Sequence, residues 1–282
     1  DRCEFVAEFA EPYAARVIAI MLGIPESEWK VIATESATIG LSLGVTIRED
    51  LPQIEAALQR LYDYCDDLIA DRRANPRDDM ITRLTEVEVE RDDGTVTQLD
   101  NVEIAAFASL LGGAGAETVT KLIASAGVLF ARHQDQWQML REDRTTIPAA
   151  FEELLRYEGP SQYDIRWSNV EVELHGRVIP RHKPVMLING SATRDERAFA
   201  DPDRFDITRA HSGHNLGFGY GIHSCLGAAL ARMEGRVALD VLSDFVREPL
   251  FDTEEVEKER HVILEELSMS YDIPSYRADL LI

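Results

Sequence analysis

Phe218-Gly219-Tyr220-Gly221-Ile222-His223-Ser224-Cys225-Leu226-Gly227 is the stretch that decides the fold. Its first glycines alternate with bulkier residues, and glycine permits backbone conformations and close ligand approach that other residues resist. A helix-forming run follows directly, from Ala228 to Glu234. Cys225 is therefore predicted at the start of a helix, where free backbone N–H groups and the helix dipole stabilise a thiolate. The thiolate is the form of cysteine that binds metals.

The pattern F-G-x-G-x-H-x-C-x-G resembles the haem-binding signature of the cytochrome P450 family. By this resemblance Cys225 is the thiolate ligand of the iron in haem b, and such a ligand favours O–O cleavage. The resemblance also implies a set of cofactor-binding residues in the same stretch: Phe218, Gly219, Gly221, His223 and Gly227. The alternative is a glycine-rich loop with a buried, inert cysteine.

Composition limits the classes of partner. The chain has 282 residues, enough for one large domain or two ordinary ones, and 45% of them are hydrophobic. A net charge of -22 argues against nucleic acid and anionic membranes as partners, because both would repel it. The same charge weakly favours a basic electron-donor protein.

The cysteines are odd in number and widely separated: Cys3, Cys65 and Cys225. No C-x-x-C occurs, so we expect a reducing compartment without disulfides, which is the cytoplasm. We find no signal peptide and no apolar run that approaches the length of a membrane span.

Hydrophobic periodicity predicts a mainly α-helical fold with a small β part. Helices are expected at 3–22, 51–73, 80–84 and 149–157, and strands at 170–174, 178–179 and 185–188. Asp93-Gly94 predicts a small hairpin. The resemblance implies an incomplete cytochrome P450 fold, because in that family a substantial N-terminal portion precedes the segment that Asp1 begins.

The most apolar predicted helix runs from Val102 to about Phe130 and starts at the capping box Asp100–Glu103. Gly112, Gly113 and Gly115 lie in its middle, and each costs about 1 kcal/mol relative to alanine. Such glycines predict a kink or the close approach of a ligand.

The stretch from Ala114 to Thr118 resembles the A-G-x-D/E-T motif of the P450 I helix. The resemblance implies that Thr118 and Glu117 are catalytic: Thr118 would hold water or O2 over the distal face of the haem, and Glu117 would help to relay protons. It also places Ala114 and Gly115 against the cofactor. The alternative is a notch for helix packing with a capping threonine.

Glu153 and Arg156 share one face of a predicted helix, which alone indicates only a surface ion pair. The resemblance assigns them to the structural E-x-x-R pair of the K helix, with Arg204 as third partner. It also places Arg166 on a haem propionate, with His223 as a second candidate. Asn215 stands where many family members have a histidine, which puts one propionate contact in doubt.

The P450 resemblance covers residues 1 to about 242. Residues 243–282 instead resemble a fragment of the M16 (insulinase-type) zinc peptidases, in which Glu259 and Glu266 match the spacing that supplies a zinc ligand. An acidic amphipathic helix explains this tail as well. The H-x-x-E-H motif of those peptidases is absent from the sequence, so a zinc peptidase is excluded for this chain. A fusion or a misassembled reading frame is left open.

The implied function is a haem-thiolate monooxygenase that inserts one oxygen atom of O2 into an apolar small molecule. A ferredoxin/reductase-type donor would supply its electrons. A peroxide-driven enzyme is a second interpretation, against which Glu117 and Thr118 speak, since such relatives tend to lose that pair. A non-catalytic haem-binding remnant is a third, because parts of the family fold are expected to be missing.

Overall fold

The computed structural model describes residues 4–40, 47–210 and 215–245. The chain divides into two compact units, Asp1–Asp240 and Val241–Ile282. Of the second unit only 241–245, the end of one helix, is among the described residues. The first unit is mainly helical with small sheets, as the sequence predicts.

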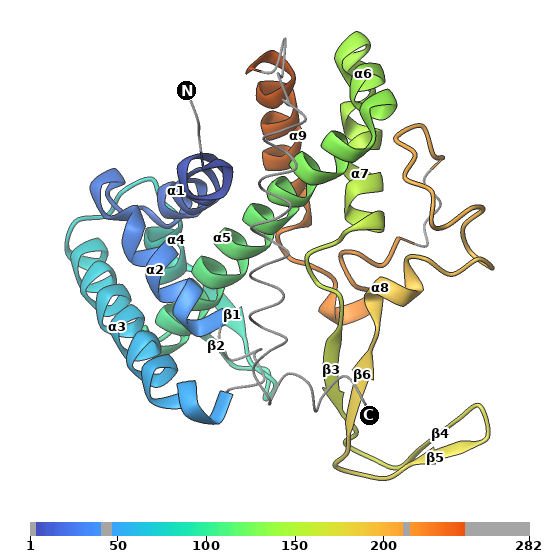
Figure 1. The fold of residues 1–282 in the computed structure, drawn as a ribbon. Coiled ribbons are helices and arrows are strands. Elements are labelled where there is room, and N and C mark those ends of the chain that lie inside the picture. The colour runs from blue at the N-terminus through green and yellow to red at the C-terminus, as the bar shows by residue number, and fades with distance from the viewer. Residues whose placement is uncertain (1–3, 41–46, 211–214, 246–282) are drawn as a thin grey trace. The chain divides into compact units, whose positions relative to one another are not determined.

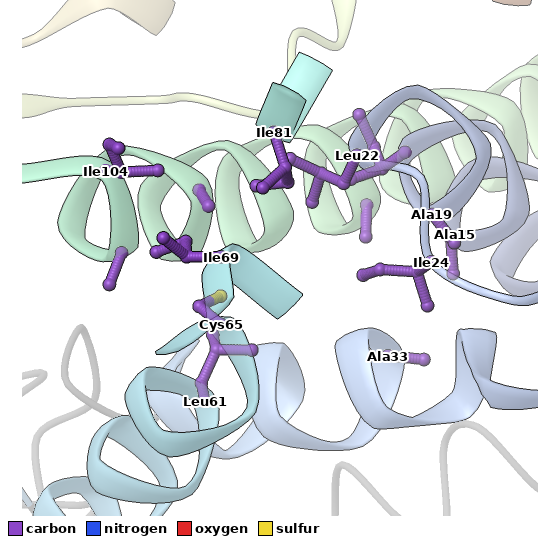
Figure 2. Close-up of a cluster of buried hydrophobic side chains, with 14 residues drawn as sticks. Ala15, Ala19, Leu22, Ile24, Ala33, Leu61, Cys65, Ile69, Ile81 and Ile104 are labelled. Carbon is purple, nitrogen blue, oxygen red and sulfur yellow. The ribbon is translucent and has the colours of Figure 1, made fainter. Parts of the chain in front are cut away.

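Five helices form the first half of the fold (Figure 1). They are α1 (Glu11–Leu22), α2 (Trp29–Gly40), α3 (Ile47–Ala74), α4 (Met80–Glu86) and α5 (Asn101–Arg132), with a π-helix at Val6–Ala10 and a 3-10 turn at Glu26–Glu28. Their apolar faces meet in one cluster, in which Leu22, Leu61, Ile69, Ile81 and Ile104 are almost fully buried (Figure 2). Burying such side chains is the main favourable contribution to folding.

Helix α5 begins at the predicted capping box. Glu103 N–H donates to Asp100 Oδ1 at 2.8 Å, and Asp100 N–H donates to Glu103 Oε2 at 2.9 Å. The helix continues without a break through its three central glycines. A Cβ on Gly115 would lie 2.3 Å from Cδ1 of Ile18, so this glycine is required by the packing of α1 on α5. The close approach at Gly115 is thus made by another helix.

By length and composition α5 could also cross a membrane, contrary to the expectation that no apolar run reaches that length. Length and composition alone are weak evidence for a membrane span, because the core helix of a globular protein can have both. Ile104, Ala108 and Ala116 of α5 are buried against the neighbouring helices, which is what a core helix does.

A buried arginine joins the ends of three of these helices. Arg72 of α3 donates from Nε to Asp79 Oδ2 and from Nη2 to the Gly23 carbonyl, both at 2.5 Å. Asp79 also caps α4 by accepting from Thr82 N–H at 2.8 Å. Gly23 ends α1 with φ +80, and a Cβ there would collide with Asp79. This contact was not predicted, since its members lie in three separate segments.

The described strands form three antiparallel pairs. They are β1 (Glu88–Glu90) with β2 (Val96–Gln98), β3 (Asp164–Trp167) with β6 (Pro184–Leu187), and β4 (Val172–Leu174) with β5 (Arg177–Ile179). The β1–β2 hairpin turns at Gly94, with φ +80, as Asp93-Gly94 predicts. Strand β3 was not expected as a strand, because its partner lies about 20 residues along the chain.

Four further helices follow in the chain: α6 (Gln134–Glu142), α7 (Ile147–Tyr157), the short α8 (Asn189–Ala192) and α9 (Ala228–Phe245). Helix α6 was not predicted, because its sequence QDQWQMLRE is polar apart from Trp137, Met139 and Leu140. Helix α7 begins two residues before the predicted Ala149.

Candidate functional site

The segment that ends at Cys225 is a closed loop. Cys225 N–H donates to the Phe218 carbonyl at 2.8 Å, and a 3-10 turn, Gly221–His223, lies between them. Helix α9 begins three residues after the cysteine, and Ala228 N–H donates to the Cys225 carbonyl at 3.3 Å. The cysteine therefore lies at a helix start, as predicted, and its thiol is exposed, unlike the buried cysteine of the alternative interpretation.

Two glycines of the loop have a backbone conformation that favours glycine. Gly219 and Gly221 both have φ +70, which side chains with a Cβ rarely adopt. Gly217, just before the signature, has a different reason to be glycine, because a Cβ there would lie 2.5 Å from Cγ of Leu155. A Cβ on Gly227 would be 3.9 Å from the sulfur of Cys225, an ordinary contact.

Helix α7 supports this loop from one side. The Asn215 amide donates to the Glu152 carbonyl at 3.1 Å and accepts from Gly217 N–H at 3.1 Å. The Phe218 ring stacks on Phe151 at a centroid distance of 6.4 Å. Asn215 thus anchors the loop to protein backbone, which explains an amide at this position.

A buried ion cluster on α7 confirms that Glu153 and Arg156 are paired. Arg156 Nε donates to Glu153 Oε2 at 2.7 Å, Nη2 donates to Oε1 at 2.8 Å, and both side chains are fully buried. The side chain predicted as the third partner, that of Arg204, is not the one that reaches Glu153. Arg209 Nε lies 3.2 Å from Glu153 Oε2, whereas the Arg204 side chain is largely exposed beside Asp206.

Arg204 takes part through its backbone. Its carbonyl accepts from Arg156 Nη2 at 3.2 Å and from Arg209 Nη2 at 2.8 Å. The physical reason is the chain path: Arg204 lies in an irregular segment whose carbonyls face the cluster, so the next available guanidinium, five residues on, reaches Glu153.

Helix α5 exposes one stripe of residues, while other residues of the helix are buried. Leu110, Ala114, Thr118 and Lys121 follow one another at helical spacing along it, and Leu110 is 68% exposed. Thr118 Oγ1 donates to the Ala114 carbonyl at 2.8 Å, which leaves its oxygen lone pairs free for a donor from outside the helix. Two predicted site residues, Ala114 and Thr118, therefore share this stripe.

Glu117, the acid predicted to act with Thr118, binds a lysine of its own helix. Its carboxylate is half-buried and accepts from Lys121 Nζ at 2.5 Å, one turn further along α5. The structure shows no hydrogen bond between the described side chains of Glu117 and Thr118.

The two residues predicted to bind the haem propionates, Arg166 and His223, lie on separate elements. Arg166 lies on β3 opposite Val185, and its Nη1 donates only to the carbonyl of Ile165 at 3.0 Å within the described residues. His223 is exposed at the end of the 3-10 turn. Neither has a carboxylate partner in the part of the chain that the structure describes.

The donor set fits a haem. The cysteine sulfur at a helix start suits iron. Arg166 and His223, which have no carboxylate partner among the described residues, suit the two propionates of haem. The loop also exposes apolar side chains. Ile222 is 98% exposed and Leu226 is 79% exposed, which is unusual for large apolar residues of one short loop. Among the described residues no group of three His, Cys, Asp or Glu side chains could hold a metal ion.

The cytochrome P450 family model matches residues 42–271. The chain belongs to the cytochrome P450 family. Cytochrome P450s bind haem b through a cysteine thiolate, and the match contains the loop that ends at Cys225. The match also runs past residue 242, where we expected the resemblance to end, and so covers most of the tail.

Individual P450s give the same result. Cytochrome P450 126 of Mycobacterium tuberculosis is 39% identical over 243 residues, which are 85% of this chain and 57% of that protein. The 6-deoxyerythronolide B hydroxylase of Saccharopolyspora erythraea is 37% identical over 239 residues, with the same coverage of 85% and 57%. This chain therefore spans less than two thirds of the length of these curated relatives.

A solved P450 structure has the same fold. P450BioI, crystallised with an acyl carrier protein ligated to hexadec-9Z-enoic acid, superposes with a TM-score of 0.81 at 33% identity. The superposition covers 87% of this chain and 62% of that one. The M16-like tail remains a prediction, and Glu259 and Glu266 lie outside the described residues, as does Cys3.

Sequence reasoning missed the residues that hold the loop in place. Phe151, Glu152 and Arg232 all contact the loop or its neighbours, yet none belongs to a motif that the sequence singled out. The available signal was weak: Glu152 precedes the E-x-x-R glutamate, and Arg232 is an arginine in the apolar start of α9.

Proposed function

We propose that this chain carries the haem-thiolate site of a monooxygenase that inserts one oxygen atom of O2 into an apolar small molecule. The observation that carries the proposal is the closed loop, in which Cys225 N–H bonds to the Phe218 carbonyl and an exposed thiol precedes α9. Bound haem b supplies the activation of O2, with electrons from a ferredoxin/reductase-type donor.

The residues of the chain have separate tasks in this proposal. Cys225 ligates the iron, and Arg166 and His223 bind the propionates. Gly219 and Gly221 let the loop backbone approach the flat cofactor. The exposed stripe of α5 faces the reacting side, where Leu110 and Ala114 exclude water and favour an apolar substrate.

Proton delivery in the proposal depends on Thr118. Its hydroxyl proton is held by the Ala114 carbonyl, so its oxygen accepts a hydrogen bond from water at the stripe. Glu117, which binds Lys121, is the proposed acid that exchanges protons with that water.

A carbon monoxide difference spectrum of the reduced chain tests the haem-thiolate site. We expect a thiolate-type band in the parent and in Cys65→Ala and Cys3→Ala, and none in Cys225→Ala. Cys65 is a matched control because it is a buried free thiol that contacts Ser109 in the helical core. An unchanged band in Cys225→Ala, or no haem binding by the parent, would overturn the proposal and leave a remnant without catalysis.

A second measurement tests the role of Thr118. Thr118→Ala should keep its haem content but release more peroxide per electron consumed, because the hydroxyl that positions water is lost. Thr120→Ala is the control: its Oγ1 makes the same type of bond to the Ala116 carbonyl at 2.8 Å, but it also faces Ala10 of the neighbouring segment. Equal peroxide release in Thr118→Ala and the parent would contradict the relay, and a peroxide-driven enzyme would then be favoured.

The proposal also includes the cellular location and the partners of the protein. Free cysteines and the acidic charge support a cytoplasmic protein with a basic redox partner, without nucleic acid or a membrane as a partner. A solved relative binds an acyl carrier protein, which makes a carrier-bound acyl chain one apolar substrate to test here.

The tail is the remaining part of the proposal. Residues 243–282 have two interpretations: the M16-like segment that the sequence predicts, and a P450 continuation, which the family match up to 271 supports. Truncation after Arg247 separates the two. Unchanged haem content and melting temperature support the separate segment, and a large loss of either supports the P450 continuation.

A further inference from the structure

Arg232 of α9 makes two contacts at the cysteine loop. Its guanidinium lies over the Phe218 ring, with Cζ 4.6 Å from the centroid. Its Nε donates to Glu152 Oε1 at 2.5 Å and its Nη2 to Glu152 Oε2 at 3.5 Å, so the two planar groups face each other. The arginine thereby joins α9 to α7 across the loop.

Phe218 is the residue through which this contact reaches the cysteine. Its carbonyl accepts the Cys225 N–H that closes the loop, while its ring has both Arg232 and Phe151 as neighbours. A ring held on two sides restrains the Cα of Phe218 that carries it, and the carbonyl is bonded directly to that Cα. The position of the thiol thus depends on Arg232 and Glu152.

The geometry leads us to propose that Arg232 and Glu152 are positioning residues for Cys225, acting through Phe218. The inference rests on the proposed haem-thiolate function for its consequence, but the contact itself belongs to the haem-free chain. The planar guanidinium is essential, because it both stacks on the ring and forms two parallel hydrogen bonds. Lysine keeps the charge and can still lie near the ring, but its ammonium lacks the planar fork that makes the two-pronged contact with Glu152.

Amide hydrogen exchange of the haem-free chain tests the contact directly. In Arg232→Lys and Glu152→Gln we expect the Cys225 amide to exchange about fivefold faster than in the parent, because both variants lose the guanidinium–carboxylate pair that holds Arg232 against the Phe218 ring. The control is Arg60→Lys. Arg60 binds Glu35 with the same two-pronged geometry, at 2.9 and 2.7 Å, but joins α2 to α3.

The outcomes separate positioning from general stability. Faster exchange in Arg232→Lys and Glu152→Gln but not in Arg60→Lys supports the proposal. Equal exchange at Cys225 in all three variants and the parent overturns it, and so does a uniform increase that includes Arg60→Lys, which reports only lower stability.

The haem-loaded chain gives a second readout. We expect Arg232→Lys to lose part of its thiolate-type carbon monoxide band in favour of the band of protein without thiolate ligation, while Arg60→Lys keeps the parental ratio. A parental ratio in Arg232→Lys contradicts positioning at the iron. If the parent shows no thiolate band at all, the proposed function fails, but the exchange experiment still decides the contact.

Discussion

Helices α5 and α7 each carry an acid and a base at helical spacing, and the two pairs lie in opposite environments. Glu117 and Lys121 lie beside the exposed stripe of α5, with their side chains 32% and 54% exposed. Glu153 and Arg156 of α7 are fully buried and bind each other through two hydrogen bonds. The sequence spacing is nearly the same, so the difference comes from what packs on each helix.

The buried pair has a task that the exposed pair lacks. Arg156 also donates to the carbonyls of Thr193 and Pro202, at 3.0 and 2.8 Å, in a segment without regular structure. Such carbonyls need donors when they are removed from water, and a helix or sheet does not supply them here. The guanidinium of α7 therefore takes the place of secondary structure for the segment that leads to the cysteine loop.

The largest effect is expected at this buried pair. Glu153→Gln leaves Arg156 and Arg209 without their carboxylate, and breaking a buried ion pair typically costs about 3–5 kcal/mol. Denaturant unfolding of the parent and the variant measures the loss. Glu35→Gln, which breaks the partly exposed pair with Arg60, is the control and should cost far less. A loss below about 0.5 kcal/mol in Glu153→Gln would contradict the burial.

Glu234 of α9 is a buried carboxylate for which the described residues provide no ion partner. It is 2% exposed, and its Oε1 has no hydrogen-bond partner in the part of the chain that the structure describes. Burial raises the pKa of Glu234 from 4.5 to about 7. The burial of Tyr13 itself, and then the charge of Glu234, raise the pKa of Tyr13 to about 12, and its hydroxyl donates to the Glu234 backbone carbonyl.

The second prediction follows from the sign of the Glu234 shift. The folded state binds the proton more tightly, so this stability is present in full below about pH 4.5 and is lost as the pH rises through about 7. Glu234→Gln keeps a neutral side chain of the same shape. At about pH 8 it should be up to roughly 3 kcal/mol more stable than the parent, and at about pH 4.5 equal to it.

Unfolding curves of both proteins across this pH range are the measurement. A parent with pH-independent stability between about 5 and 8, or a variant no more stable at the upper end, would show that Glu234 reaches solvent or a partner.

The third prediction concerns a contact on α5 that contains no charge. Gly115→Ala gains helix propensity but forces a methyl group against Ile18, which is buried, and overpacking typically costs about 1–3 kcal/mol. Ile18→Ala removes both atoms that the methyl group would meet. In the Ile18→Ala background the same substitution should therefore be neutral or stabilising, and the double-mutant cycle measures this coupling. Additive effects would mean that the glycine serves another purpose.

Whether a feature could be predicted from the sequence depends on how far apart its contacting residues lie along the chain. The capping box at Asp100 and the turn at Asp93-Gly94 were predicted, because each is determined within a few residues. The cysteine loop was predicted for the same reason. Glu153 and Arg156 were predicted through a family resemblance, since their spacing alone indicates a surface pair.

The rest depends on contacts between distant segments. Arg209 replaces Arg204 because the path of an irregular segment brings it to Glu153, 56 residues away. The stacking of Arg232 on Phe218 requires α7 and α9 to meet at the loop. Periodicity and local motifs carry no information about such meetings, so these parts of the site needed the structure.

The smallest effect is expected at the exposed pair of α5. Glu117→Gln removes the bond to Lys121, and an exposed pair at this spacing contributes about 0.3–0.5 kcal/mol. Unfolding should therefore change little, far less than for Glu153→Gln. If the variant also releases more peroxide per electron, Glu117 acts on proton delivery and not on folding. A loss of stability above about 1 kcal/mol would instead show that the two helices do not differ as their exposure indicates.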